Sequence, residues 1–276
     1  MKPTKARKPA AKAKTAVPKR PAVMTGASVP VLRWPPDEDR VETIFERLSG
    51  IMPEPKTELN FSNPFTLVVA VALSAQTTDV AVNKATDRLF QVADTPEKML
   101  ALGEEGLVPY IASIGLYRGK ARNVIALSRI VLEQHGGEVP LNRADLQALP
   151  GVGRKTASVV LNELGIEAAI AVDTHVFRVS HRLGLANAST PDKVEAQLFK
   201  VVPEQWLPKA HHWLILHGRY TCVARKPLCP TCVVRDLCRF KDKTKELPDE
   251  KPKAPASVQR AIKKTTKSSG AKRARR

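Results

Sequence analysis

Paired helix signals recur through the middle of the 276-residue chain. The dipeptides Asn63-Pro64, Thr95-Pro96 and Thr190-Pro191 each place an N-cap residue ahead of a proline, which fits the first position of a helix. Glycines, which commonly close helices, follow at positions 103, 136 and 184. This pattern predicts an all-α fold with helices over about 37–49, 64–74, 78–92, 96–102, 105–113, 118–135, 143–149, 154–164, 174–183, 191–202 and 208–221.

Hydrophobic periodicity supports one of these helices directly. Over 118–135, the apolar residues Val124, Leu127 and Val131 fall on one side at 100° per residue. The opposite side carries three arginines, Arg118, Arg122 and Arg129. We therefore predict a buried stripe backed by a basic, solvated face. The apolar run at 168–172 is strand-like but too short to infer a sheet.

Most of the net charge lies at the two ends of the chain. Residues 1–33 hold nine Lys/Arg and no acid, and residues 241–276 hold thirteen Lys/Arg and four acids. The formal net charge of +18 therefore comes from the ends, because residues 34–240 hold 23 basic and 23 acidic residues. Both ends are rich in Lys, Ala and Pro with few large apolar residues, so we predict two disordered basic arms, 1–33 and 241–276. Such arms would attract nucleic acid in a salt-sensitive way.

Neither end suggests export or membrane insertion. No stretch approaches the roughly 18 to 20 apolar residues that a membrane span needs, and the start lacks the apolar core of a signal peptide. We expect a soluble, cytoplasmic protein with no membrane partner. A hydrophobic content of 43% is enough to fill one or two cores.

All four cysteines lie within seventeen residues, at Cys222, Cys229, Cys232 and Cys238. Without an export signal, a disulfide pair is unexpected, whereas four thiolates in one short segment can converge on a metal centre. Structural zinc sites often use two Cys-x2-Cys pairs, and this segment has one. Iron–sulfur clusters accept more varied spacing, so we favour a [4Fe–4S] cluster over zinc.

Basic residues surround these cysteines. Arg225 and Lys226 lie between the first two, and Arg219, Arg235 and Arg239 flank the segment. They could offset the negative charge of a thiolate-bound cluster. A loop held by metal could equally present Arg225 and Lys226 to a phosphate backbone.

The stretch "LPGVGRKT" at 149–156 interrupts helical sequence with two glycines and a lysine. A helix, a Pro-Gly-Val-Gly turn and a second helix form a helix-hairpin-helix. Its backbone N–H groups, at Gly151, Val152 and Gly153, and the positive end of the second helix would bind a DNA phosphate. Taken alone, the motif also fits a plain corner between two helices that carries a surface lysine.

Several further motifs in order make the likeness specific. They are "LSAQTTD" (73–79), "IGLYRGKA" (114–121), "LPGVGRKTASVVLN" (149–162), "AVDTHVFRV" (171–179) and "HHWLILHGRYTC" (211–222). With these motifs, residues 37–240 resemble the bacterial endonuclease III family of the helix-hairpin-helix DNA glycosylase superfamily. The resemblance implies one helical domain over 59–168, with the hairpin at 149–162, and a second over 34–58 and 169–240 that carries the cluster loop. Neither basic arm is covered.

The resemblance also implies an activity and its residues. The chain would be a bifunctional DNA glycosylase and AP lyase that removes damaged bases, above all oxidised pyrimidines, and nicks the strand by β-elimination. Lys155 would be the nucleophile that forms a Schiff base, and Asp173 its catalytic partner. Gln76 would fill the space left by the extruded base, and Leu116 would wedge into the opposite strand. Damaged or abasic double-stranded DNA would be the partner of a monomeric, nucleoid-associated protein.

Chemistry limits what these two catalytic groups can do. A free lysine amine is mostly protonated at neutral pH, so the site must favour the neutral amine, as a helix N-terminus and desolvation both do. A carboxylate paired with Lys155 would oppose this. We therefore expect Asp173 to stabilise positive charge on the sugar and to transfer a proton later, while also capping the helix that begins near Thr174.

Two rivals stay open from the sequence. A monofunctional adenine glycosylase would share the hairpin and the cluster, but such relatives do not place a lysine at position 155. A non-catalytic DNA-binding module with a structural metal would share the basic arms. Four histidines, His175, His211, His212 and His217, are expected to be buried and hydrogen-bonded rather than metal ligands.

Overall fold

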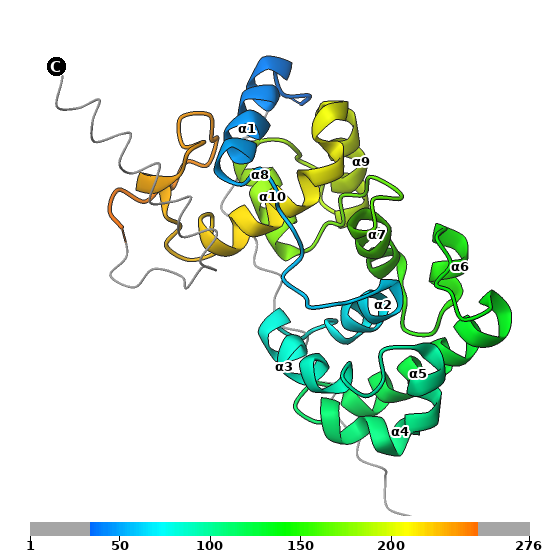
Figure 1. The fold of residues 1–276 in the computed structure, drawn as a ribbon. Coiled ribbons are helices and arrows are strands. Elements are labelled where there is room, and N and C mark those ends of the chain that lie inside the picture. The colour runs from blue at the N-terminus through cyan, green and yellow to red at the C-terminus, as the bar shows by residue number, and fades with distance from the viewer. Residues whose placement is uncertain (1–33, 248–276) are drawn as a thin grey trace, which may run out of the picture. The chain divides into compact units, whose positions relative to one another are not determined.

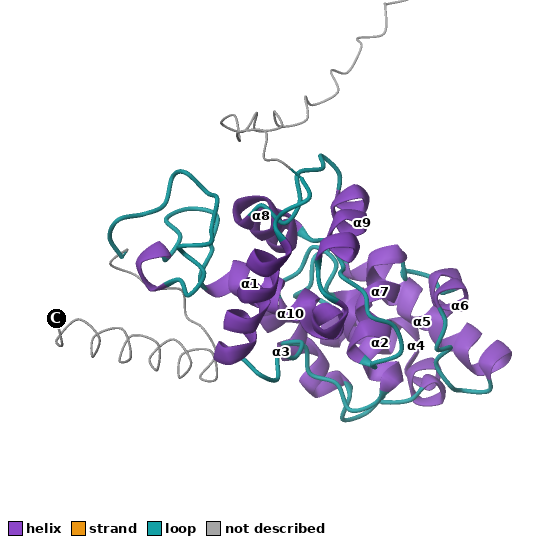
Figure 2. Ribbon diagram, turned by 90° about the horizontal axis from the view of Figure 1, so that it is seen from above, coloured by secondary structure: helices purple, strands orange, loops and turns teal. Residues whose placement is uncertain are grey.

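The computed structural model describes residues 34–247, and these residues are helical with no strand among them (Figure 2). The predicted all-α class is confirmed, and the run at 168–172 is extended connecting chain. The helices, labelled in Figure 1, are α1 (Glu38–Ile51), α2 (Pro64–Leu73), α3 (Asp79–Leu89), α4 (Pro96–Ile111), α5 (Tyr117–His135), α6 (Arg143–Ala148), α7 (Arg154–Glu163), α8 (Thr174–Leu183), α9 (Pro191–Val201) and α10 (Leu207–Tyr220), with short 3-10 turns η1 (Glu204–Trp206) and η2 (Cys229–Thr231).

Local capping explains where several helices begin. The Asn63 side chain accepts the Thr66 backbone N–H, and the Thr66 hydroxyl accepts the Asn63 N–H, which forms a capping box ahead of α2. Thr95 caps α4 in the predicted way, with a proline at the first helical position. Thr190 precedes α9 and its proline, but its side chain makes no capping hydrogen bond.

Two predicted helices follow each other within α4. The backbone of Gly103 departs from helical geometry, with φ +67°, so the element is broken between 96–102 and the segment after it. A residue with a side chain would be strained in this conformation, whereas glycine adopts it freely. The break lets the two halves of α4 lie at different angles.

Helix α5 buries the predicted stripe. Val124, Leu127 and Val131 are buried. The three arginines of the opposite side, Arg118, Arg122 and Arg129, are exposed, so the predicted amphipathic pattern is confirmed. The helix ends at Gly136, which adopts the left-handed conformation typical of a glycine cap.

Two hydrophobic clusters form the core. The first runs from Leu59 to Leu161 and is built from α2 to α7. The second combines Val41, Ile44, Phe45 and Leu48 of α1 with side chains between Ile170 and Val234. The described residues fall in one compact unit, so the division into domains at 58/59 and 168/169 stays a prediction.

The predicted arms lie mostly outside the described residues. Residues 1–33 and 248–276 are not described, but residues 241–247 are. Lys243 Nζ donates to Cys238 O at 2.6 Å, and the Thr244 hydroxyl donates to Pro227 O. The predicted start of the tail at 241 is therefore too early, because two side chains after it bind the cysteine segment. Within 34–247, no helix is long and apolar enough to cross a membrane.

Candidate active site

The hairpin between α6 and α7 provides open backbone amides. Gly151 has φ +81°, a conformation that favours glycine, and a Cβ atom there would lie 3.1 Å from the Asn123 side chain, which would have to shift. Gly153 is the N-cap residue of α7, and it has no side chain that could accept a hydrogen bond. The first backbone N–H groups of α7 are therefore not capped. Val152 differs from the expectation: its side chain is buried, and its N–H donates to Leu149 O at 3.0 Å. The Val152 amide is thus already used within the turn.

Lys155 and Asp173 line the same cavity, of about 1150 Å³. Lys155 is the second residue of α7 and is exposed. The exposed position of Lys155 does not show the desolvation expected from the sequence. The helix N-terminus beside it is present in the structure as expected.

Asp173 begins helix α8. Its Oδ1 accepts the N–H of His175 at 2.8 Å and that of Val176 at 2.7 Å. The expected N-cap is therefore present, and a single carboxylate oxygen provides it. Among the described residues, Oδ2 accepts no hydrogen bond, so the second oxygen is available for another task.

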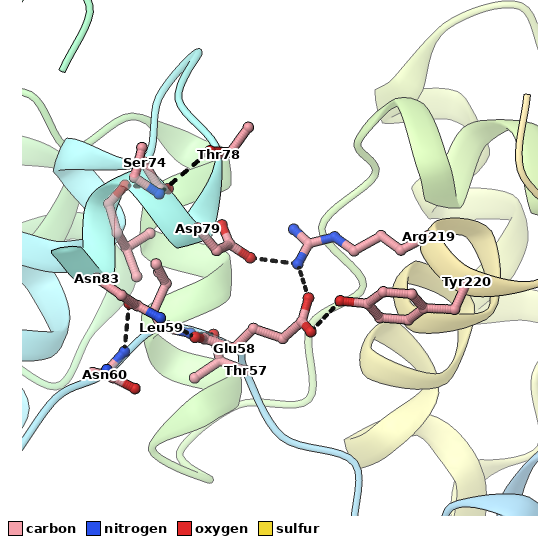
Figure 3. Close-up of polar contacts among 12 residues, drawn as sticks. Thr57, Glu58, Leu59, Asn60, Ser74, Thr78, Asp79, Asn83, Arg219 and Tyr220 are labelled. Atoms are coloured by element: carbon pink, nitrogen blue, oxygen red, sulfur yellow. Dashed lines mark hydrogen bonds and ion pairs between the residues drawn. The ribbon is translucent and has the colours of Figure 1, made fainter. Parts of the chain in front are cut away.

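The cavity also holds a charged network that the sequence did not predict. The Arg219 Nη1 atom of α10 lies 2.5 Å from Glu58 Oε2 and also contacts Asp79 Oδ2 (Figure 3). The Tyr220 hydroxyl donates to the other oxygen of Glu58. Burial lowers the pKa of Arg219, but Asp79 and Glu58 outweigh it and the net pKa is raised. Asp79 and Tyr220 lie inside quoted motifs, yet nothing in the sequence indicated that they meet.

Arg219 flanks the cysteine segment in the sequence, but its charge is paired with Glu58 and Asp79. Its guanidinium is directed toward the loop before α2 and the start of α3 instead (Figure 3). The sequence distance of three residues to Cys222 is misleading, because α10 ends at Tyr220 and the chain changes direction there.

Three of the four unassigned histidines are buried, as expected. His212 Nε2 lies 2.8 Å from Glu163 Oε2, and His217 lies 3.7 Å from the Cys232 sulfur. The Nδ1 atom of His211 departs from the expectation, because it is buried without a partner among the described residues. Burial lowers the pKa of His211 to about 3, which keeps the ring neutral. The half-buried His175 also has a lowered pKa, mainly from burial.

Gln76 and Leu116 lie together at the edge of a second cavity, of about 260 Å³. Gln76 follows α2 and Leu116 precedes α5, and both side chains are exposed. Gly151 of the hairpin lines the same cavity. Two residues from separate motifs are thus brought beside the candidate phosphate-binding turn.

The four cysteines form no disulfide and lie in a loop on the second core cluster. Burial, with smaller effects of the neighbouring Cys222, Cys238 and Cys229, raises the pKa of the Cys232 thiol to about 12, so the four sulfurs are close enough to interact. Yet within 34–247 no group of three or more His, Cys, Asp or Glu side chains is placed to hold one metal ion. Four free thiols in one loop are the donor set that holds a [4Fe–4S] cluster.

Two arginines of α8 hold the cysteine segment, and the sequence did not predict them. Arg182 donates to Val223 O at 2.8 Å and contacts Cys222 Sγ at 3.4 Å. Arg178 Nε donates to Cys222 O at 3.0 Å. Their spacing of four residues places them on one face of the helix, but the segment they hold is about forty residues away in the sequence. Arg225 and Lys226 are exposed on the loop, and Lys226 has φ +51°.

Comparisons with known proteins agree with this arrangement. Residues 69–204 match the model of the HhH-GPD superfamily base excision DNA repair proteins, and residues 222–238 match the iron–sulfur binding domain of endonuclease III. Endonuclease III of Escherichia coli K12 is 58% identical over 200 residues, covering 72% of this chain and 95% of that protein. That of Haemophilus influenzae is 54% identical over 204 residues, covering 74% of this chain and 96% of that protein.

A solved structure shows the same fold. A trapped endonuclease III–DNA covalent intermediate, an estranged-adenine complex, superposes with a TM-score of 0.69 at 44% identity, covering 74% of this chain and 96% of that chain. A non-covalent endonuclease III–DNA complex gives the same TM-score and identity.

The hairpin beside the lysine-bearing cavity and the cysteine segment define a helix-hairpin-helix base-excision DNA repair enzyme, a DNA glycosylase with AP lyase activity. It binds DNA and contains a [4Fe–4S] cluster. Within that class, the chain belongs to the endonuclease III family.

Proposed function

We propose that Lys155 and Asp173 carry out the two chemical steps, glycosidic cleavage and strand nicking. The observation that carries this proposal is that both residues line one cavity, each at the N-terminus of a helix. A DNA phosphate held by the open amides of the hairpin would place the sugar beside Lys155. DNA that closes over the exposed amine would remove water from it and favour its neutral form.

The bonds change in a defined order. The neutral Lys155 Nζ attacks C1′ of the sugar, and the C1′–N bond to the base breaks, with the base taking the electron pair and then a proton. The adduct loses a proton and the sugar ring opens, which gives a Schiff base between Nζ and C1′. Loss of a C2′ proton then expels the 3′ oxygen, so the strand is nicked, and water releases the lysine.

Asp173 acts on charge rather than on Lys155 directly. As the base departs, positive charge develops on the sugar, and a carboxylate fixed in place stabilises it. The N-cap bonds to Oδ1 hold the carboxylate in one orientation without using Oδ2. The same group can accept a proton later in the cycle.

Other residues would hold the DNA open. Gln76 would occupy the space vacated by the extruded base and Leu116 would enter the opposite strand, offsetting part of the unstacking cost. The amides of Gly151 and Gly153 would bind one phosphate, and Arg225 and Lys226 would bind the backbone beyond it. Both basic side chains are exposed, as such contacts require.

The substrate we propose is double-stranded DNA with oxidised pyrimidines or abasic sites, bound by a monomer at the bacterial nucleoid in the cytoplasm. A base must leave the stack before C1′ can be attacked, and the 1150 Å³ cavity beside Lys155 has room for it. Charged and hydrogen-bonding side chains in the cavity, such as Arg219 and Asp79, suit a polar damaged base.

Cys222, Cys229, Cys232 and Cys238 would supply the four thiolates to the cluster. The cluster, when bound, holds the segment together, and this makes the loop with Arg225 and Lys226 rigid. Mass spectrometry of Cys→Ser variants would test the ligands: each single variant should lose iron, and a variant that keeps a full complement would exclude that cysteine.

Borohydride trapping tests the proposed nucleophile. The wild-type protein, incubated with abasic duplex DNA and borohydride, should form a covalent adduct through reduction of the Schiff base. Lys155→Gln should bind the DNA and form no adduct, while Lys193→Gln, an exposed lysine of α9, should form it at the normal rate. An adduct of undiminished yield in Lys155→Gln would exclude Lys155 as the nucleophile. Binding of DNA by the wild-type protein without any adduct would instead favour the non-catalytic module.

A further inference from the structure

Gln76 and Leu116 share an unusual backbone conformation. Gln76 has φ +56° and Leu116 has φ +60°, although neither is glycine. Such left-handed conformations cost about 1 kcal/mol or more for residues with side chains, so the surroundings have to hold them in place. Leu116 is also 72% exposed, an uncommon position for a large apolar side chain whose backbone is constrained.

One residue contacts the backbone of both loops. Lys120, in the first turn of α5, is only 8% exposed. Its Nζ donates to Ala75 O at 2.7 Å and to Thr77 Oγ1 at 2.9 Å, on the two sides of Gln76. Its backbone N–H donates to Leu116 O at 3.1 Å. Lys120 is thus hydrogen-bonded both to the turn that carries Leu116 and to the residues on either side of Gln76.

The lysine is also saturated with partners. Lys120 Nζ donates a third hydrogen bond to Leu73 O at 2.9 Å, so all three N–H donors of the ammonium are used. Leu73 is the last residue of α2, and a cation is stabilised beside the carbonyls at a helix C-terminus. Because a buried cation is costly without such partners, this arrangement fixes the loop geometry strongly.

We propose that Lys120 is a positioning residue that keeps Gln76 and Leu116 at a fixed separation, so that both enter the DNA together when a base is extruded. This inference rests on the proposed insertion of these two residues. Loops that are ordered before binding lose less conformational entropy when they insert, which leaves more of the contact energy to offset the few kcal/mol of unstacking. Lys120 itself does not contact the reacting atoms.

Lys120→Met is the direct test, because methionine keeps the apolar stem and removes the three donors. A duplex with a fluorescent base analogue beside the damaged nucleotide reports extrusion in stopped flow. We expect extrusion to slow by about tenfold. The free energy that corresponds to this change in rate is a fraction of the unstacking cost. Borohydride trapping on an abasic site inside an unpaired bubble, where little has to be unstacked, should stay within about twofold of the wild-type rate.

Control variants separate positioning from general destabilisation. Ser128→Ala, in the same helix, removes a buried hydroxyl that bonds only within α5, and should leave extrusion unchanged. Thr77→Val removes one acceptor of the Lys120 ammonium and should slow extrusion in the same direction but less. All rates are compared at equal intervals below each variant's Tm, which corrects for differences in stability. If Lys120→Met does not fold, Thr77→Val still tests the inference.

A double-mutant cycle gives the decisive result. In a Gln76→Ala/Leu116→Ala background, loss of Lys120 should cost little further, because the residues it positions are absent. An undiminished loss in that background, or equal slowing on duplex and bubble, would overturn the inference. Failure of the wild-type protein to be trapped on either substrate would instead overturn the proposed function.

Discussion

The Oδ1 atom of Asp173 accepts the backbone N–H of Val176 at 2.7 Å, so the carboxylate proposed for catalysis also begins helix α8. Structural and chemical roles can therefore be separated by substitution. Asn caps a helix about as well as Asp but carries no charge, whereas Ala provides neither the cap nor the charge.

Asp173→Asn should slow base release more than it weakens DNA binding, because the lost charge acts only as the base departs. Asp173→Ala should show the same defect and also lose about 1 kcal/mol of folding stability with the cap. Single-turnover kinetics, fluorescence anisotropy and thermal unfolding measure the three quantities. Equal losses of rate and affinity in Asp173→Asn would contradict the proposed role.

Gly151→Ala tests the hairpin turn. The φ of +81° strains an alanine by about 1 kcal/mol or more, and the new Cβ would press on Asn123 at 3.1 Å. We expect a lower Tm and weaker DNA binding. The control Gly50→Ala lies at an exposed position in α1 with no atom within 4 Å, and should raise stability by about 0.5 kcal/mol. Normal affinity in Gly151→Ala would exclude the turn as a phosphate site.

Arg219→Met tests the charged network of the cavity. It leaves the Glu58 and Asp79 carboxylates half-buried without their cation, so we expect a loss of about 3 kcal/mol in unfolding free energy. Arg129→Met is the matched control, because its pair with Glu133 is 3.9 Å long and exposed, and should change stability by less than about 0.5 kcal/mol. Denaturant unfolding compares the two; similar small effects would mean that the network contributes nothing to folding.

The buried His211 makes stability dependent on pH. Burial lowers its pKa from 6.5 to about 3, so below pH 6.5 the unfolded chain binds a proton that the folded protein excludes. This contribution to stability is present above pH 6.5 and decreases as the pH falls toward 3. Compared with wild type, His211→Gln should lose less Tm between pH 7 and pH 5, whereas His135→Gln, a partly exposed histidine, should follow the wild type. An identical loss in all three proteins would contradict this assignment.

The basic ends should control the salt dependence of DNA binding. Residues 1–33 carry nine Lys/Arg and residues 248–276 carry ten, whereas residues 34–247, with 26 basic and 25 acidic residues, have a formal net charge of only +1. A 34–247 variant should therefore show a flatter slope of log affinity against log salt, with unchanged single-turnover chemistry. Truncation at 240 should additionally loosen the cysteine segment, because it removes Lys243 and Thr244. An unchanged slope in the 34–247 variant would refute the role of the ends.

Local features of the sequence determined the helices. Asn63, Thr95 and Asp173 satisfy amides within three residues of themselves, and the stripe of Val124, Leu127 and Val131 needs only the helical repeat. Interactions between residues so close in the sequence can be predicted without knowledge of the tertiary structure. The cysteine spacing and the "LPGVGRKT" turn are equally local, which is why the metal segment and the hairpin could be predicted.

Tertiary structure alone decided which distant side chains meet. Arg219 contacts Glu58 across 161 positions, Arg182 reaches the cysteine segment across 41, and Lys120 reaches Ala75 across 45. These contacts depend on how helices pack, and a single sequence does not encode the packing in any short pattern. The sequence therefore determined the helices, the turn and the cysteine ligands. The tertiary structure decided the charged network of the cavity, the hydrogen bonds of Arg178 and Arg182 to the cysteine loop, and the contacts of Lys120 beside Gln76 and Leu116.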